Sequence, residues 1–202
     1  MKIMSIAAVL VINLFIAVRY TILIRRGGIK PALAMWTFFS IAVGGSLATY
    51  LFEGDYTPLD NILNTADLFL CVYVSVIIYV FGDTSTRFNR FDRGCLVAVL
   101  AILTMWAFTR RHTEAHLLIQ LILVIAYFPV IKRLWNSSEN TESFAVWAGL
   151  LLAPVFSLLS SKGVLASVYA VRAIVSTSVL MILMARADLR GRRLRAAADR
   201  AP

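Results

Sequence analysis

The sequence predicts an all-α polytopic membrane protein with seven transmembrane helices, and three observations support this fold class. Of the 202 residues, 60% are hydrophobic and 15% are charged, which leaves too little polar surface to cover a water-soluble fold of this size. The apolar residues gather in seven stretches that are separated by short polar connections. The chain also contains an internal duplication, which is a common design of membrane transporters.

Six of the seven stretches have the length that a bilayer requires, because its hydrocarbon core accommodates about 20 residues of helix. The expected spans are Ile3–Ile24, Ala32–Phe52, Ile62–Phe81, Cys95–Phe108, Ala115–Ile131, Phe144–Ser160 and Gly163–Ala185. The fourth is too short to cross unless Thr109 and the residues before Cys95 extend it. The alternative is six spans with a re-entrant segment, and we favour seven.

The first stretch follows Lys2 and could be mistaken for a secretory signal peptide. Arg19 and Tyr20 stand where a small-residue cleavage site would lie. We therefore expect this stretch to be a membrane helix.

The basic residues of the connections predict the orientation of the helices. Seven spans place the first, third and fifth connections on the same side as the C-terminal tail. That side carries fourteen Lys and Arg residues, whereas the other side carries only Lys2, Arg110, Arg111 and Lys162. We expect the N-terminus outside and the C-terminus in the cytoplasm, in a cell membrane of the bacterial inner-membrane type.

The net charge of +9 belongs mainly to this cytoplasmic side of the membrane. Because the basic residues lie in connections and in the tail, without a recognisable nucleic-acid-binding module, we expect no nucleic-acid partner. The tail, residues 186–202, is expected to contact anionic lipid headgroups.

No motif in the sequence indicates an enzyme. The chain has no nucleophile elbow, no phosphate-binding loop and no carboxylate pair at one depth on a shared face. His112, Glu114 and His116 have the spacing of a metal site but lack a third ligand. Cys71 and Cys95 are interpreted as small apolar fillers. We expect no catalytic residue, metal or cofactor.

The two halves of the chain align along their polar residues. The first spans of the halves share residue types that lipid tolerates poorly or that occur at membrane interfaces. The aligned pairs are Asn13/Gln120, Tyr20/Tyr127, Arg25/Lys132, Arg26/Arg133, Trp36/Trp147, Asn64/Tyr169, Asp67/Arg172 and Asp83/Asp188. Three helices, a linking fourth and three more form a 3+1+3 plan, in which the fourth helix makes the two repeats parallel.

This plan divides the chain into four expected units. Residues 1–83 form the first three-helix repeat, and residues 84–114 form the linker helix with its loops. Residues 115–185 form the second three-helix repeat, and residues 186–202 form the basic cytoplasmic tail.

The run Ala126-Tyr127-Phe128-Pro129, followed by Lys132-Arg133-Leu134-Trp135, precedes Trp147. With these motifs and the 3+1+3 plan, the chain resembles a divergent member of the SWEET/PQ-loop transporter superfamily. The resemblance implies two three-helix bundles with a sugar or another small polar solute between them, and alternating access through bending at a Pro-Gln pair. Pro129 stands at that hinge position, whereas Val130 replaces the glutamine and Ile22 replaces the proline of the first half. A neighbouring family of similar plan, the nicotinamide riboside transporters, remains an alternative.

Two polar stripes in the spans are the main candidates for a solute site. Asn64 and Asp67 recur at helical spacing on the third span, and Tyr169, Arg172 and Ser176 do so on the seventh. A lone charge in the middle of a bilayer is costly, so the simplest expectation is that Asp67 and Arg172 pair. The pair either lines the solute cavity or clamps the halves together, and we favour the first.

Further candidates lie on the first, second, fifth and sixth spans. His116, Gln120 and Tyr127 form a stripe on the fifth span, and Asn13 partly mirrors it on the first. These groups either bind the solute or join neighbouring helices. The aligned pair Trp36 and Trp147 either stacks on the solute or belongs to the interfacial aromatic belt, which its position near the cytoplasmic end favours.

The resulting expectation is a transporter for a small polar solute such as a sugar, nucleoside or vitamin, acting as a monomer or homo-oligomer. The alternative is a ligand receptor or sensor on the same scaffold that does not transport.

Overall fold

In the computed structural model, the described residues are 1–27, 29, 33–82, 90–136, 140 and 143–198, and within these ranges the chain contains helices and no strand. The elements are α1 (Lys2–Arg25), α2 (Leu33–Glu53), the short 3-10 helix η1 (Pro58–Asn61), α3 (Ile62–Phe81), α4 (Arg90–Thr109), α5 (His112–Ile125), α6 (Phe128–Asn136), α7 (Phe144–Ser157) and α8 (Val164–Ala198). The all-α fold class is therefore confirmed. The aligned pair Asp83/Asp188, part of the linker loop and the last four residues of the tail involve positions outside the described ranges.

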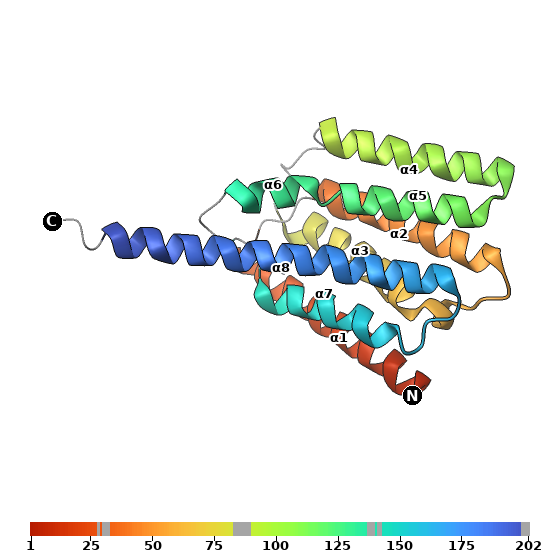
Figure 1. The fold of residues 1–202 in the computed structure, drawn as a ribbon, viewed down its shortest axis with the longest axis horizontal. Helices are drawn as coiled ribbons and strands as arrows, with labels where there is room; N and C mark the ends of the chain where they lie inside the picture. The colour runs from red at the N-terminus through yellow and green to blue at the C-terminus, as the bar shows by residue number, and fades with distance from the viewer. Residues whose placement is uncertain (28, 30–32, 83–89, 137–139, 141–142, 199–202) are drawn as a thin grey trace.

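The helices run side by side in one bundle, with the N-terminus at one end and α8 extending beyond the other (Figure 1). In the described part of the chain, six segments are long and apolar enough to cross a membrane, among them the continuous segment His112–Asn136 that combines α5 and α6. A shorter apolar helix, α7, lies beside them. These features are compatible with the predicted multi-pass membrane protein.

Two predicted span lengths are corrected. The fourth span is not short, because α4 begins at Arg90 and ends at Thr109. The short helix is α7, whose 14 residues end at Ser157 rather than at Ser160. Pro154 lies inside α7 and has no N–H to donate within the helix, and the chain continues from Leu158 to Ser160 as a turn.

The predicted fifth span is divided between α5 and α6. Its helix stops at Ile125 and resumes at Phe128. Pro129 cannot donate a hydrogen bond to the carbonyl of Ile125, four residues earlier. At the break, Tyr127 N donates to the carbonyl of Val124, which is three residues earlier and not four, at 3.1 Å. The break therefore follows from the position of the proline.

Packing within the bundle joins segments that are far apart in sequence. Within the N-terminal half, α3 packs against both α1 and α2, and within the C-terminal half, α8 packs against α5, α6 and α7. Between the halves, α1 packs against α7 and α2 packs against α5. Helix α4 packs against α2 and α5.

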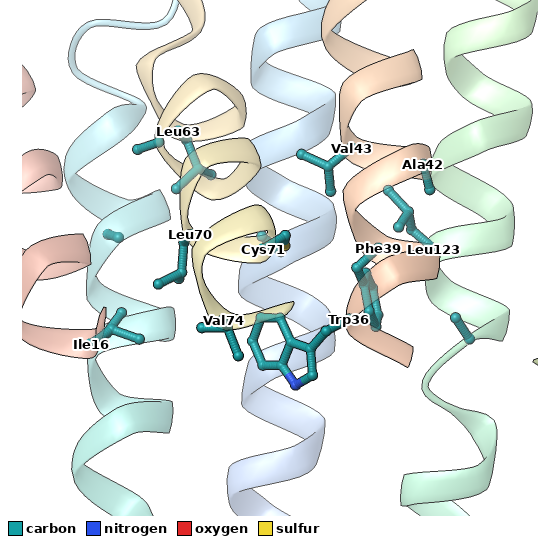
Figure 2. Close-up of a cluster of buried hydrophobic side chains, with 14 of the residues drawn as sticks. Ile16, Trp36, Phe39, Ala42, Val43, Leu63, Leu70, Cys71, Val74 and Leu123 are labelled. Carbon is teal, nitrogen blue, oxygen red and sulfur yellow. The ribbon is translucent and has the colours of Figure 1, made fainter. Parts of the chain in front are cut away.

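The two contacts between the halves differ in chemistry. The α1–α7 contact is close and largely apolar: a Cβ added at Gly149 would lie 2.9 Å from Ile16 Cγ1, so glycine lets the two backbones approach. Apolar side chains of α2 and α3, including Val43, Leu63 and Leu70, fill the adjoining core (Figure 2). The α2–α5 contact carries buried polar groups, which form the candidate site.

Candidate functional site

Ser46 is the centre of a buried hydrogen-bond network between α2, α3 and α5. Its hydroxyl oxygen lies 2.7 Å from Gln120 Nε2, which donates to it. The Asn64 amide lies 3.0 Å from the same hydroxyl. With its amide oxygen facing Ser46, Asn64 accepts from the hydroxyl, and its nitrogen donates to the carbonyl of Val43 at 3.0 Å. Ser46 then accepts one hydrogen bond and donates another, which satisfies all three side chains.

His116 extends this network along α5. Gln120 Nε2 lies 3.3 Å from His116 Nε2, and His116 Nδ1 lies 3.1 Å from the carbonyl oxygen of Ser46. A neutral imidazole with its proton on Nδ1 fits both neighbours, because it donates to the carbonyl and accepts from the amide. Thr49 Oγ1 donates to the same carbonyl at 2.9 Å.

Arg172 connects this network to the aromatic side chains of the second half. Its Nε donates to Gln120 Oε1 at 3.1 Å, and its guanidinium lies 4.7 Å from the ring centroid of Tyr169. The predicted candidates Asn64, Gln120, Tyr169 and Arg172 therefore meet in one place. The ring of Tyr127 packs against Phe39 and Trp147.

Asp67 and Arg172 do not form the direct ion pair that the sequence suggested. Among the described residues, oppositely charged groups lie within 4.0 Å only in the pairs Lys2–Asp60 and Arg111–Glu114. Tyr169 connects the two charges instead, since its hydroxyl donates to Asp67 Oδ2 at 2.9 Å while its ring contacts the guanidinium. Nothing in the residue spacing showed that an aromatic side chain would lie between them.

Two aromatic pairs form between residues that the sequence alignment of the halves matches, Tyr20 with Tyr127 and Trp36 with Trp147. Tyr20 and Trp36 pack edge to face with ring centroids 5.2 Å apart, and Tyr127 and Trp147 do so at 6.3 Å. Phe39 lies 5.5 Å from Tyr127 by the same measure. Among the described residues, the buried Trp36 Nε1 has no hydrogen-bond partner. Both tryptophans are therefore packed inside the bundle, which argues against the predicted interfacial aromatic belt (Figure 2 shows Trp36).

The remaining predicted residues lie outside the network. Asn13 Nδ2 donates to the carbonyl of Val9 on its own helix at 3.0 Å, and its buried Oδ1 has no hydrogen-bond partner in the described part of the chain. Ser176 is buried on α8. Pro129 is exposed near the start of α6, beside the helix break.

The three residues of the His-x-Glu-x-His run have separate partners. His112 Nδ1 accepts a hydrogen bond from Trp106 Nε1 at 2.7 Å, Glu114 pairs with Arg111 at 3.0 Å, and His116 belongs to the network. Within the described ranges, no group of three His, Cys, Asp or Glu side chains is placed to hold a metal ion.

A second polar cluster ties the halves together at the end of the bundle that contains the N-terminus. The Lys162 amide donates to the carbonyl of Asp60 at 2.9 Å, and the Tyr50 hydroxyl donates to the carbonyl of Lys162 at 2.8 Å. Lys2 forms an ion pair with the Asp60 carboxylate at 2.8 Å. We call Lys2, Tyr50, Asp60 and Lys162 the outer contact.

Ser46 and Thr49 belong to the site but were not predicted from the sequence. Serine and threonine are common in membrane helices, so neither residue is informative by type. In the register that aligns Trp36 with Trp147, Ser46 falls opposite Ser157, but only the fold shows that the hydroxyl of Ser46 faces α3 and α5. Comparison of the chain with protein-family models, curated proteins and solved structures finds no match.

Proposed function

We propose that the protein is a membrane transporter for a small polar solute, working by alternating access between two three-helix bundles. The observation that carries the proposal is the polar cluster inside the spans, formed by Ser46, Asn64 and Asp67 of one half and Gln120 and Arg172 of the other. Ionisable side chains in membrane spans are rare and commonly mark pathways for solutes or ions.

The packing of the helices supports the 3+1+3 plan. In this plan α1, α2 and α3 correspond to α5, α7 and α8. The contact of α1 with α7 then corresponds to the contact of α5 with α2. The packing of α3 against α1 and α2 corresponds to the packing of α8 against α5 and α7. The Tyr20–Trp36 and Tyr127–Trp147 pairs match in the same way. A site between such repeats is the usual location for a solute in transporters built from parallel repeats.

The contacts on either side of the cluster suggest how access would alternate. The outer contact joins Tyr50 and Asp60 of the first half to Lys162 of the second. Toward the other end of the bundle, Phe39 of the first half packs on Tyr127 of the second. Opening toward the outside requires the outer contact to break. Opening toward the cytoplasm requires the Phe39–Tyr127 contact to break.

Counterflow in proteoliposomes tests the proposal. Vesicles containing the purified protein are preloaded with unlabelled sugars, nucleosides, amino acids or organic acids, and uptake of the labelled form is measured. We expect one solute class to exchange, and Arg172→Gln to reduce that exchange. Ser40→Ala is the matched control, because within the described ranges the Ser40 hydroxyl bonds only the carbonyl of Trp36 on its own helix. A solute that stabilises the protein without exchanging would contradict transport and favour the receptor alternative.

Pro129 provides a second test of the same proposal. In Pro129→Ala the new N–H can donate to the carbonyl of Ile125 and continue the helix across the break. We expect slower counterflow with little change in the solute concentration that gives half-maximal thermal stabilisation. An unchanged exchange rate would remove Pro129 as the hinge.

A further inference from the structure

We propose that the cytoplasmic end of α8 binds an anionic phospholipid in a groove formed by α8 itself. The groove has a volume of about 600 Å³ and is lined by Ile182, Ala185, Arg186, Leu189, Arg190 and Arg193. This binding site is separate from the proposed solute site. It requires that α8 crosses the membrane, but it does not require that the protein transports a solute.

The groove combines an apolar end and a cationic end on one face of the helix. Residues that are three, four, seven or eight positions apart share a helical face, which places the six lining side chains in one strip. Ile182 is 67% exposed and Leu189 is 56% exposed. Large exposed apolar side chains next to arginines match an amphipathic ligand, in which an acyl chain continues into a charged headgroup.

The length of α8 places this strip at the headgroup level. The 35 residues of α8 rise about 52 Å at 1.5 Å per residue, whereas the hydrocarbon core is about 30 Å thick. A crossing that begins at Val164 ends near Leu183. Arg186 then lies about 5 Å beyond the core, among the headgroups. The backbones of Arg190 and Arg193 lie about 10 and 15 Å beyond the core, so their long side chains must extend back along the helix to reach the headgroups.

Among the residues that the structure describes, no carboxylate is placed to neutralise the cationic end of the groove. Arg186 is held by α6, because its Nη1 donates to the carbonyl of Trp135 at 3.2 Å and its guanidinium lies 4.1 Å from the Trp135 ring centroid. No carboxylate in the described part of the chain lies within 4.0 Å of Arg190 or Arg193. The planar, multidentate guanidinium suits phosphate oxygens, so the phosphate of a lipid supplies the missing negative charge.

Native mass spectrometry of the full chain, released from micelles that contain phosphatidylcholine and phosphatidylglycerol, tests the inference. We expect phosphatidylglycerol to be retained preferentially. The double variant Arg190→Gln with Arg193→Gln should weaken that retention by about tenfold, because two charge-assisted contacts are lost. The matched control is Arg192→Gln with Arg26→Gln, which removes the same charge from the same side of the membrane but leaves the groove intact.

Several outcomes would overturn the proposal. Equal weakening in the two double variants would indicate general surface charge rather than a groove. Equal retention of phosphatidylcholine would remove the role of net lipid charge, and displacement by millimolar glycerol phosphate would indicate a site for free phosphate. Circular dichroism and size exclusion establish that each variant is folded, so that a loss of lipid is not caused by unfolding.

Discussion

At the scale of single residues, the candidate site depends on matching each donor with an acceptor. The Ser46 hydroxyl receives a hydrogen bond from Gln120 and donates one to Asn64, so a single small side chain satisfies two amides. Buried polar groups without partners are costly. The sequence predicted Asn64 and Gln120 because amides in apolar spans are conspicuous, whereas Ser46 could be recognised only from the fold.

Replacing Ser46 should therefore destabilise the bundle more than replacing Ser40, the other serine of α2. Ser46→Ala leaves Gln120 Nε2 and Asn64 Oδ1 each without one partner, and we expect a loss of about 1–3 kcal/mol in the free energy of unfolding. The measurement is equilibrium unfolding in mixed detergent micelles. Ser40→Ala is the control and should change stability little, and equal losses in the two variants would contradict the network.

The bridge through Tyr169 also makes a prediction for the two charges. Tyr169→Phe removes the hydroxyl that donates to Asp67, and a hydrogen bond to a charged group contributes about 1.5–3 kcal/mol. A double-mutant cycle of Asp67→Asn with Tyr169→Phe should therefore show a clear coupling energy. Exchanging the charges, with Asp67→Arg and Arg172→Asp, should restore little stability, because the two side chains do not pair directly. Substantial recovery in this swap would instead favour the direct pair.

At the scale of elements, most of the bundle could be predicted from the lengths of the apolar stretches. The predicted helix bounds were wrong near two prolines and at the start of α4, where charged residues begin the helix. Arg90 and Arg93 concealed the start of α4, because charged residues there can reach the headgroups while the backbone stays helical. Pro129 interrupts the fifth span through its missing N–H group, and α7 ends at Ser157, three residues after Pro154.

The close contact between α1 and α7 can be tested at Gly149. In Gly149→Ala the new methyl would lie 2.9 Å from Ile16 Cγ1, and such overpacking costs about 1–3 kcal/mol. Gly94→Ala in α4 is the control, since an added Cβ there meets no atom within 4 Å and alanine favours helix over glycine. Unfolding in detergent should show a loss for the first variant and no loss for the second. Ile16→Val should recover part of the loss by removing a methyl group from the contact.

At the scale of the whole molecule, composition was sufficient to predict helices in a membrane, because only regular backbone satisfies its hydrogen bonds in lipid. The residues that meet at the site could be predicted only in part. Of the aligned polar residues, Asn64 and Asp67 lie on α3, which packs against the α8 helix that carries Tyr169 and Arg172. Their partners depend on helix rotation, which a sequence with 60% hydrophobic residues specifies weakly. The orientation in the membrane rests on charge alone and stays a prediction.

That orientation predicts which end of the bundle is accessible from outside the cell. The N-terminus and the α2–η1 connection lie at the opposite end from the C-terminal end of α8 (Figure 1). The arginines at the C-terminal end of α8 and those of the other basic connections should lie in the cytoplasm. Cys71 and Cys95 are buried, so introduced cysteines can be labelled selectively with a membrane-impermeant thiol reagent. In intact cells, Asp55→Cys should react and Arg192→Cys should react only after permeabilisation. The reverse pattern would place the outer contact in the cytoplasm and would also contradict the headgroup assignment for α8.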